Sequence, residues 1–381
     1  LYVTTATNDV LLWNDGSGRF TQDTRFHTAG WHAGAAIADV NGDGRPDLYV
    51  AGYADMQHPI SGSVKGFPSN YLGVPDRLFL NEGRRRFREV AAQAGIDAKP
   101  YDHSLGALFT DVNGDGRPDL YVSNDEDPNR LYLNEPGGPL GFHFSDHARE
   151  QGVADANAGM GIADAGGYLF VSNSRRQTHA VYRRTGRGYT DIRRTFQNAF
   201  GTNLTGWGDS WVDLRNDGSP ELTLANGAIP VTNLGKDAAP PQVLARTDGR
   251  WVDSGLLRSL KTNGRGLAAG DYDNDGRVDL AINTVGGGLM LLHNTSPAGH
   301  WLEVAVKPFS PGAVVTLVRQ DGSTVVREVH AGSSYLSSED PRMHFGVGTD
   351  RTVRTVTVRY PDGRVRRVIR PELDRVLTVA R

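Results

Sequence analysis

A twelve-residue segment occurs twice in this chain without a single change, and this duplication limits the possible folds more than any other feature. Asp39–Val50 and Asp111–Val122 both read Asp-Val-Asn-Gly-Asp-Gly-Arg-Pro-Asp-Leu-Tyr-Val. Three weaker copies are a looser one at Asp271–Ile282, a degenerate one at Asp213–Glu221 and a relic without the loop at Gly161–Val171. The first aspartates of the copies stand at 39, 111, 164, 213 and 271. Repeats of about 40 to 50 residues with strand-like content are typical of β-propeller blades.

A second motif alternates with the first. It consists of a short apolar strand, an Asn/Asp/Gly turn and an aromatic residue that opens another strand, which is a hairpin pattern. Its copies are Asn8–Phe20, Asp76–Phe87 and Asn129–Glu135, with weaker ones at Val181–Tyr189 and Val243–Trp251. Each repeat then holds four strands, so we predict a propeller of six or seven four-stranded blades.

The period changes after residue 296. Short β-type runs separated by turn signals follow, including Gln320–Ser323 and Pro361–Gly363. We therefore predict an all-β chain with two domains, a propeller over residues 1–296 and a small β-module over residues 297–381.

Composition narrows the functional classes. The chain has 381 residues, of which 38% are hydrophobic and 22% charged, as in a folded globular protein. A net charge of −3 argues against a nucleic-acid partner, and no apolar run is long enough to span a membrane. Cysteine is absent, which excludes disulfides and thiolate sites. Leu1-Tyr2-Val3 matches the end of the duplicated segment, so we expect the chain to begin within a repeat; we also expect a monomer.

The acidic loop of each repeat carries the clearest chemistry. In Asp39–Asp47, oxygen-bearing side chains stand at positions one, three, five and nine, and Gly44 permits a tight turn. Such a set suits Ca²⁺ better than octahedral Mg²⁺, and the absence of His and Cys from the loops disfavours zinc and copper. We predict about three structural Ca²⁺ ions. The predicted ligands, in which each arginine contributes its backbone carbonyl group, are Asp39, Asn41, Asp43, Arg45, Asp47, Asp111, Asn113, Asp115, Arg117, Asp119, Asp271, Asp273, Asp275, Arg277 and Asp279.

One such loop alone could be an Asx-rich surface turn without an ion. Three complete copies in register with a repeat favour the metal-site interpretation. In the degenerate loop Arg215 stands at position three, and we predict that its guanidinium replaces the cation by pairing with Asp213, Asp217 or Glu221.

These motifs resemble known families. The acidic loops resemble the FG-GAP/VCBS repeats of calcium-binding β-propellers, and the Asn-Arg-Leu-Tyr-Leu-Asn pattern is similar to that of the cartilage acidic protein-like family. The run Val326–Ser337, followed by Asp340–Gly348, resembles the ASPIC/UnbV domain. The resemblance implies a propeller with a C-terminal β-module and implies little about activity, since a fold does not determine a function.

Polar and aromatic residues precede each predicted innermost strand. Because equivalent ends of these strands converge on one face of a propeller, we expect them to surround an axial pocket. The candidate ligand-binding residues are Trp31, His32, Tyr101, Asp102, His103, Trp207, Asp209 and Arg265. Acid–base roles would fall to His32, His103 and Asp209. The alternative is that the tryptophans pack between blades and the histidines cap strands.

Two functional hypotheses follow. The first is a calcium-stabilised binding or scaffold protein, extracellular or at the cell surface, that recognises a small molecule, glycan or protein at the axial face. The second is a calcium-dependent enzyme of the cyclase or lyase type in natural-product or polysaccharide metabolism, cytoplasmic if biosynthetic. The sequence leaves open whether the protein is an enzyme.

Overall fold

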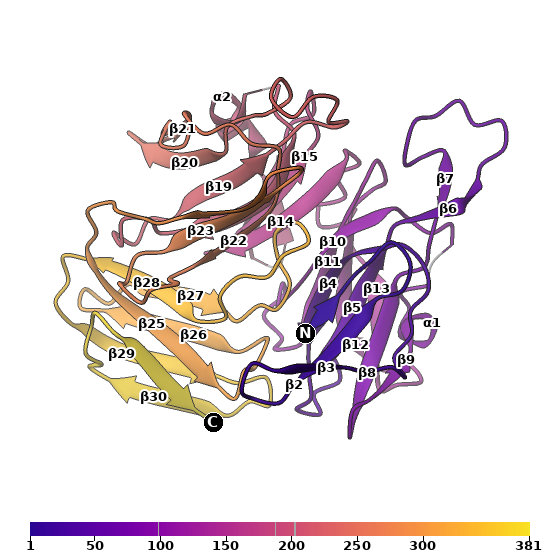
Figure 1. Cartoon of the computed structure of the whole chain (residues 1–381). Helices are drawn as coiled ribbons and strands as arrows, with labels where there is room; N and C mark the ends of the chain where they lie inside the picture. The colour runs from indigo at the N-terminus through magenta and orange to yellow at the C-terminus, as the bar shows by residue number, and fades with distance from the viewer. Residues whose placement is uncertain (98, 187, 202) are drawn as a thin grey trace.

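The computed structural model describes residues 1–97, 99–186, 188–201 and 203–381, and nearly all of its regular structure is β-strand (Figure 1). The helical segments are short: α1 (Ala91–Ala94), η1 (Arg193–Thr195) and α2 (Gln197–Phe200). The prediction of an all-β chain is confirmed.

Six sheets, called blades one to six, follow one another along the described part of residues 2–292. Blade one contains β1 (Tyr2–Val3), β2 (Val10–Asn14) and β3 (Phe20–Gln22). Blade two contains β4 (His32–Ala38), β5 (Asp47–Gly52), β8 (Arg77–Gly83) and β9 (Arg86–Glu89). Blade three contains β10 (Ser104–Thr110), β11 (Asp119–Asn124), β12 (Arg130–Pro136) and β13 (Phe142–Asp146). Blade four contains β14 (Gly159–Ala165), β15 (Tyr168–Asn173), β16 (Ala180–Thr185) and β17 (Gly188–Asp191).

Blade five contains β18 (Gly206–Val212), β19 (Glu221–Asn226), β20 (Gln242–Thr247) and β21 (Arg250–Asp253). Blade six contains β22 (Gly264–Gly270), β23 (Asp279–Thr284) and β24 (Gly288–Leu292). A separate hairpin, β6 (Ala54–Pro59) and β7 (Tyr71–Gly73), projects from blade two (Figure 1).

The first strands of blades two to six form the centre of a β-propeller. They contact one another in the order β4, β10, β14, β18, β22. Glycine permits this close approach: a Cβ atom at Gly34 would lie 2.6 Å from the carbonyl oxygen of Leu105, and one at Gly208 would lie 2.4 Å from the backbone nitrogen of Leu267. The high glycine content of the chain therefore serves the contacts between blades as well as turns.

The count of six blades among the described residues agrees with the predicted six or seven, but not every blade has four strands. Blades two to five are four-stranded, whereas blades one and six have three strands each. Blade six has no fourth strand because the chain leaves it after β24 and continues into the C-terminal module.

The C-terminal module is a sandwich of two sheets. Its strands are β25 (His300–Lys307), β26 (Val314–Arg319), β27 (Thr324–Glu328), β28 (Met343–Gly348), β29 (Val353–Arg359), β30 (Val365–Ile369) and β31 (Val376–Ala380). One sheet has the order β28-β25-β31, with β25 and β31 parallel, and the other the order β27-β26-β29-β30. Alternate side chains such as Val304, Val315, Leu317 and Val356 fill the space between them. The domain boundary predicted at residue 297 lies between β24 and β25.

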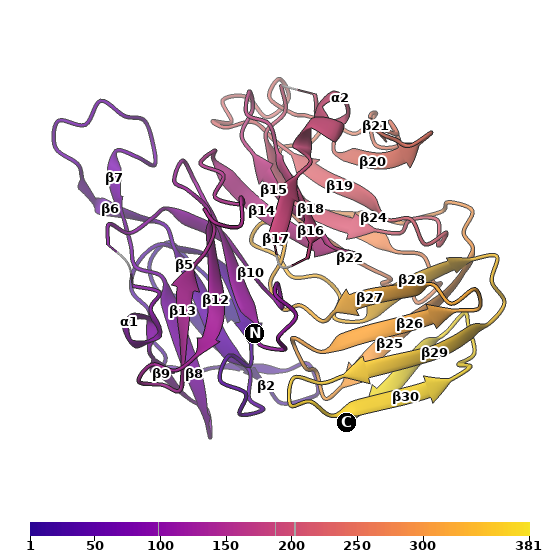
Figure 2. The same ribbon diagram turned by 180° about the vertical axis from the view of Figure 1, so that it is seen from behind.

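The module lies beside both ends of the row of blades, as the front and back views show (Figures 1 and 2). It has its own apolar core, distinct from those between the blades. Among the described residues, no helix combines the length and the apolar character needed to cross a membrane.

Candidate functional site

The acidic loops connect the innermost strand of a blade to its second strand. In blade two, the Asp39 carboxylate accepts hydrogen bonds from the backbone nitrogens of Asp43 at 3.0 Å and Gly44 at 2.7 Å. The buried Asp47 carboxylate accepts from the backbone nitrogens of Val40 at 3.0 Å and Asn81 at 2.8 Å. The first repeated motif is therefore bonded to the second one, and this arrangement recurs in blades three and six.

Burial and mutual repulsion make these loops electrostatically costly without a cation. Burial, with smaller contributions from neighbouring carboxylates, raises the pKa of Asp47 to about 7 and that of Asp119 to about 7. A bound cation would favour the ionised forms of such carboxylates. The donor set is composed of carboxylate and amide oxygens, which are the ligands that Ca²⁺ prefers.

The loop of blade six gathers its ligand atoms most tightly. Carboxylate oxygens of Asp271, Asp273 and Asp279 lie within 4.8 Å of one another. His293 Nδ1 also lies 3.2 Å from an oxygen of Asp279. The sequence interpretation missed this histidine because it considered only residues inside the loop. In the alternating motif, His293 stands where the other copies have Leu80 and Leu133, and that departure was a signal that could have found it.

The arginine of each complete loop has a role that the sequence interpretation did not foresee. Arg45 donates from Nε to the Asn81 carbonyl oxygen at 2.6 Å and pairs with Asp43 through Nη2 at 2.5 Å. Arg117 and Arg277 make the equivalent contacts in their blades. The side chain thus joins the loop to the third strand, and the role of the carbonyl group as a metal ligand stays a prediction.

The degenerate loop in blade five has the predicted ion pairs. Arg215 Nη2 lies 3.2 Å from Asp217 and 3.0 Å from Glu221. The Asp213 carboxylate still accepts hydrogen bonds from the backbone nitrogens of Asp217 and Gly218. The loop of blade five therefore keeps the hydrogen bonds to its first aspartate although an arginine occupies its third position.

All four acidic loops lie against the C-terminal module. In blade three, the backbone nitrogen of Asp111 lies 3.4 Å from Glu328 of the module, and in blade six Arg342 donates to the Asp271 carbonyl oxygen at 2.5 Å. In blade five the backbone nitrogen of Gly348 donates to the Asn216 carbonyl oxygen at 2.6 Å. The loop of blade two lines one crevice with Pro308, Phe309 and Arg381 of the module. The conformation of the four acidic loops therefore determines the surface on which the C-terminal module packs.

Residues 331–340 of the module, here called the axial segment, run along the innermost strands of the propeller. The backbone nitrogen of Ile37 in β4 donates to the Ala331 carbonyl oxygen at 2.8 Å, and Ser334 exchanges two backbone hydrogen bonds with Ile162 in β14. Ser334 Oγ accepts from the backbone nitrogen of Asp209 in β18 at 2.9 Å. The Tyr335 ring packs edge-on against Trp207 at 4.8 Å. The axis of the propeller is therefore filled by the chain itself.

The two predicted histidines each lie against an aspartate carboxylate. His32 Nδ1 lies 2.7 Å from Asp9, and His103 Nδ1 lies 2.7 Å from Asp127. Burial opposes protonation of His103, but the hydrogen bond and charge of Asp127 outweigh it and raise the pKa. Both histidines tie a strand end to a neighbouring turn, and their acid–base roles stay predictions.

The other predicted axial residues divide into an apolar group and a paired group. Trp31, Trp207 and Tyr335 belong to one apolar cluster, and the Arg265 guanidinium lies 3.9 Å above the Trp207 ring. Asp102 is paired instead with Arg130, whose Nε donates at 2.6 Å.

Tyr101 and Asp209 stand apart from both groups. The Tyr101 ring lies 5.5 Å from the Lys99 ammonium group. The Asp209 side chain is buried, which raises the pKa of its carboxyl group well above the usual value. The repeat register thus brings Trp31, Trp207 and Arg265 together, whereas His32, His103 and Asp102 pair with residues outside the predicted set.

Comparison with known proteins agrees with the predicted resemblance. Residues 305–381 match the family described as ASPIC and UnbV, and residues 1–50 match the FG-GAP-like repeat. Cartilage acidic protein 1 of Mus musculus is 27% identical over 371 residues, covering 91% of this chain and 55% of that protein. The Homo sapiens protein of the same name is 26% identical and covered over 53% of its length. The chain carries both domain types, is a homologue of these proteins and spans about half their length.

Solved structures with a similar arrangement are distant. YCF48 bound to D1 peptide gives a TM-score of 0.38 at 9% identity, over 77% of this chain and 89% of that one. A mutant of Trypanosoma rangeli sialidase displaying trans-sialidase activity gives a TM-score of 0.40 at 8% identity, over 97% of this chain and 81% of that one.

Proposed function

We propose that the protein is a calcium-stabilised β-propeller that acts as a binding or scaffold protein and recognises a ligand at its axial face. The observation that supports this most is the seating of the C-terminal module on the four acidic loops, with the axial segment between the blades. This arrangement leaves free the opposite end of the axis, where the innermost strands begin. A propeller that is held rigid by the module at one end and is uncovered at the other end can present a preformed surface to a ligand.

Calcium is the proposed structural ion of the complete loops in blades two, three and six. The ligand set is the one predicted from the sequence, and the close carboxylates of Asp271, Asp273 and Asp279 support it. We propose an extracellular or cell-surface location, where calcium modules with Kd values of about 10⁻⁴ to 10⁻³ M are used.

The proposed ligand surface is the apolar rim at the free end of the axis. Phe67 of the β6–β7 insertion stacks on Trp31 at 6.0 Å, and Leu336 at the tip of the axial segment is 49% exposed. The hairpin adds further exposed apolar side chains, namely Met56, Ile60, Val64 and Leu72. Grouped exposed apolar side chains on a folded protein mark interaction sites.

Native mass spectrometry with added Ca²⁺ tests the metal part of the proposal. We expect three bound ions and a fall in melting temperature when EDTA removes them, because the unneutralised loops repel. A count of zero would contradict the proposal, and a count of four would show that Arg215 does not replace a cation.

A comparison of baits tests the ligand surface. The wild-type chain and a Val64→Asp/Leu336→Ser variant are immobilised and exposed to the extracellular fraction of the producing organism. We expect a component that the wild type retains and the variant loses. The matched control is Val365→Asp, at a 51% exposed position on the C-terminal module, which should retain it. Equal retention by all three proteins contradicts a role for the axial face.

A further inference from the structure

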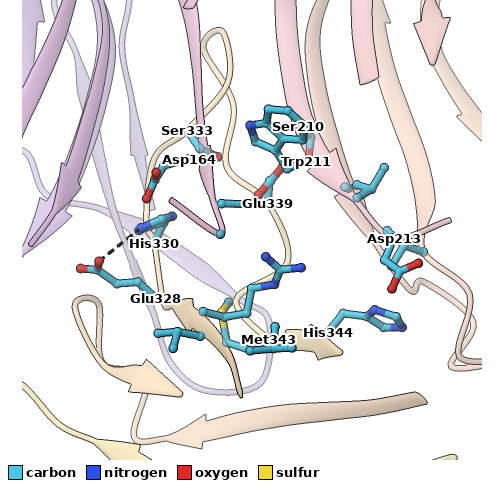
Figure 3. Close-up of a pocket in the computed structure, with 18 of the residues that line it drawn as sticks. Asp164, Ser210, Trp211, Asp213, Glu328, His330, Ser333, Glu339, Met343 and His344 are labelled. Atoms are coloured by element: carbon cyan, nitrogen blue, oxygen red, sulfur yellow. Dashed lines mark ion pairs between the residues drawn. The ribbon is translucent and has the colours of Figure 1, made fainter. Parts of the chain in front are cut away.

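A cavity of about 470 Å³, lined by both charged and apolar side chains, lies between the propeller and the C-terminal module (Figure 3). Blades four and five contribute Asp164, Trp211 and Asp213 to its wall. The module contributes Arg327, Glu328, His330, Glu339, Met343 and His344. The volume lies within the range of about 300 to 1,000 Å³ of small-molecule sites. None of the predicted axial residues lines this cavity.

The cavity exists because blade four has lost its acidic loop. Blades two, three, five and six fill the space beneath the module with a nine-residue loop, whereas blade four turns at Gly166 and Gly167. Asp164, the first aspartate of the motif, is nevertheless present. Its counterpart Asp39 accepts two backbone hydrogen bonds from its own loop, but Asp164 has no loop and its Oδ2 accepts only from Thr110 Oγ1 at 3.3 Å.

Several polar groups at the cavity wall have no hydrogen-bond partner within the described chain. These include the buried Asp164 Oδ1 and the indole Nε1 of Trp211, a residue only 9% exposed. Among the described residues the Arg327 guanidinium has no hydrogen-bond or ion-pair partner, and the charges that act on it are those of Asp213, Asp164 and Glu339. Figure 3 shows Asp164 and Glu339 among the residues that line the cavity. Buried polar atoms normally have partners, so this group indicates a missing polar ligand.

The mixture of charges selects the kind of ligand. A metal cation would face the unpaired guanidinium of Arg327, and an anion would face the carboxylates of Asp164 and Glu339. An uncharged molecule with several hydroxyl groups satisfies all three, because each hydroxyl both donates to a carboxylate and accepts from a guanidinium or an indole N–H. The ring of Trp211 and the side chain of Met343 supply apolar surface against which the carbon skeleton of such a molecule packs.

The cavity is open to solvent on one side. Gly166 of the short turn and Thr324 and Val326 of β27 line it and are exposed, with Val326 exposed to 48%. A ligand can therefore enter between blade four and β27 without separating the domains.

We propose that this interdomain cavity binds an uncharged polyhydroxylated molecule of the size of one or two sugar units, held by Asp164, Glu339 and Arg327 against the indole of Trp211. The site is separate from the axial face and does not depend on the proposed function. It takes the place left by the loop that blade four lacks.

Calorimetric titration with neutral monosaccharides and disaccharides tests the proposal, using a panel of aldohexoses, N-acetylhexosamines, pentoses and their common disaccharides. We expect at least one to bind the calcium-loaded chain, and Asp164→Asn, Glu339→Gln and Arg327→Gln each to weaken that binding by about tenfold or more. The control is Arg366→Gln on the exposed face of β30, which should bind as the wild type does. Failure of every panel member to bind, or equal binding by all variants, overturns the proposal.

The absence of cysteine permits a second, independent test. A single cysteine introduced as Val326→Cys at the cavity mouth is labelled with a bulky maleimide, and Ile369→Cys, 72% exposed on β30, receives the same label as a control. We expect the first label to abolish sugar binding and the second to leave it unchanged. Binding that survives the label at position 326 would place the sugar elsewhere. Val64→Asp/Leu336→Ser at the axial face should leave sugar binding unchanged, which separates this proposal from the proposed function.

Discussion

Blades three and four differ in the connection between their first and second strands, and this difference decides whether the first aspartate of the motif is bonded within its own loop. In blade three a nine-residue loop directs three backbone N–H groups at Asp111 and contacts Glu328 of the C-terminal module. In blade four a short turn replaces the loop, and Asp164 faces a cavity with one oxygen unpartnered. The first aspartate of the motif therefore orders a loop in blade three, as Asp111, and is free to bind a ligand in blade four, as Asp164.

The comparison teaches that losing part of a repeat need not damage a propeller. The loops of the other blades still hold the module at a fixed distance from the propeller. The module therefore does not move onto blade four, and a cavity remains where the loop is missing. The polar side chains of the module and of blade four at this place then face the cavity, where a ligand can bind.

Alanine substitution at the two aspartates should give the largest contrast. We expect Asp111→Ala to lower the free energy of unfolding by about 3 kcal/mol, because three backbone N–H groups lose their acceptor. Asp164→Ala should change it by less than about 1 kcal/mol, because it removes a poorly satisfied carboxylate. Urea denaturation of both variants in EDTA measures the difference, and equal losses would mean that the two aspartates do the same work.

A pH effect of intermediate size should arise in blade four. In blade three the backbone nitrogen of Asn124 donates to Asn129, and in blade four that of Asn173 donates to Nδ1 of the buried His179 at 2.8 Å. Burial lowers the pKa of His179 to about 4, below the 6.5 of the unfolded chain. Protonation therefore favours unfolding, and stability is lost as the pH falls from 6.5 towards 4.

We expect this histidine to cost about 2 kcal/mol between pH 7.5 and pH 5. Urea denaturation at both pH values measures the loss, and His179→Asn, which copies the residue of blade three, should remove that part of it. If the variant keeps the full pH dependence, the titrating group lies elsewhere.

The smallest change in stability should come from the degenerate loop of blade five. Arg215 is half exposed, so Arg215→Asn should cost less than about 1 kcal/mol without calcium. The substitution restores an oxygen at position three, and we expect a fourth Ca²⁺ in native mass spectrometry. A count that stays at three would show that more than Arg215 prevents binding there.

The blades could be predicted from the sequence because the hydrogen bonds that define each blade join residues of the two repeated motifs. Asp47 bonds to Val40 within its own loop and to Asn81 in the next strand pair, and both residues belong to the repeated motifs. Patterns of this kind are visible in a single sequence. The pairing of Arg215 with Asp217 and Glu221 could be predicted for the same reason.

What the sequence could not predict depends on contacts between distant segments. Asp127, the partner of His103, lies outside both repeated motifs. Asp9, the partner of His32, lies within the Asn8–Phe20 motif, but the motif does not indicate which side chain of the next blade it faces. The interdomain cavity depends on how two domains meet, and a motif search within either domain does not describe that meeting.

The axial segment has a consequence for how the protein is made. The hydrogen bond between Ile37 and Ala331 joins residues that are far apart in the sequence, and Tyr335 reaches Trp207 only after synthesis has passed residue 335. Native contacts of such high sequence separation slow folding. The blades therefore lack the segment that fills their axis until residues 331–340 have been synthesised, and a chain cut before residue 297 would form a propeller without that segment.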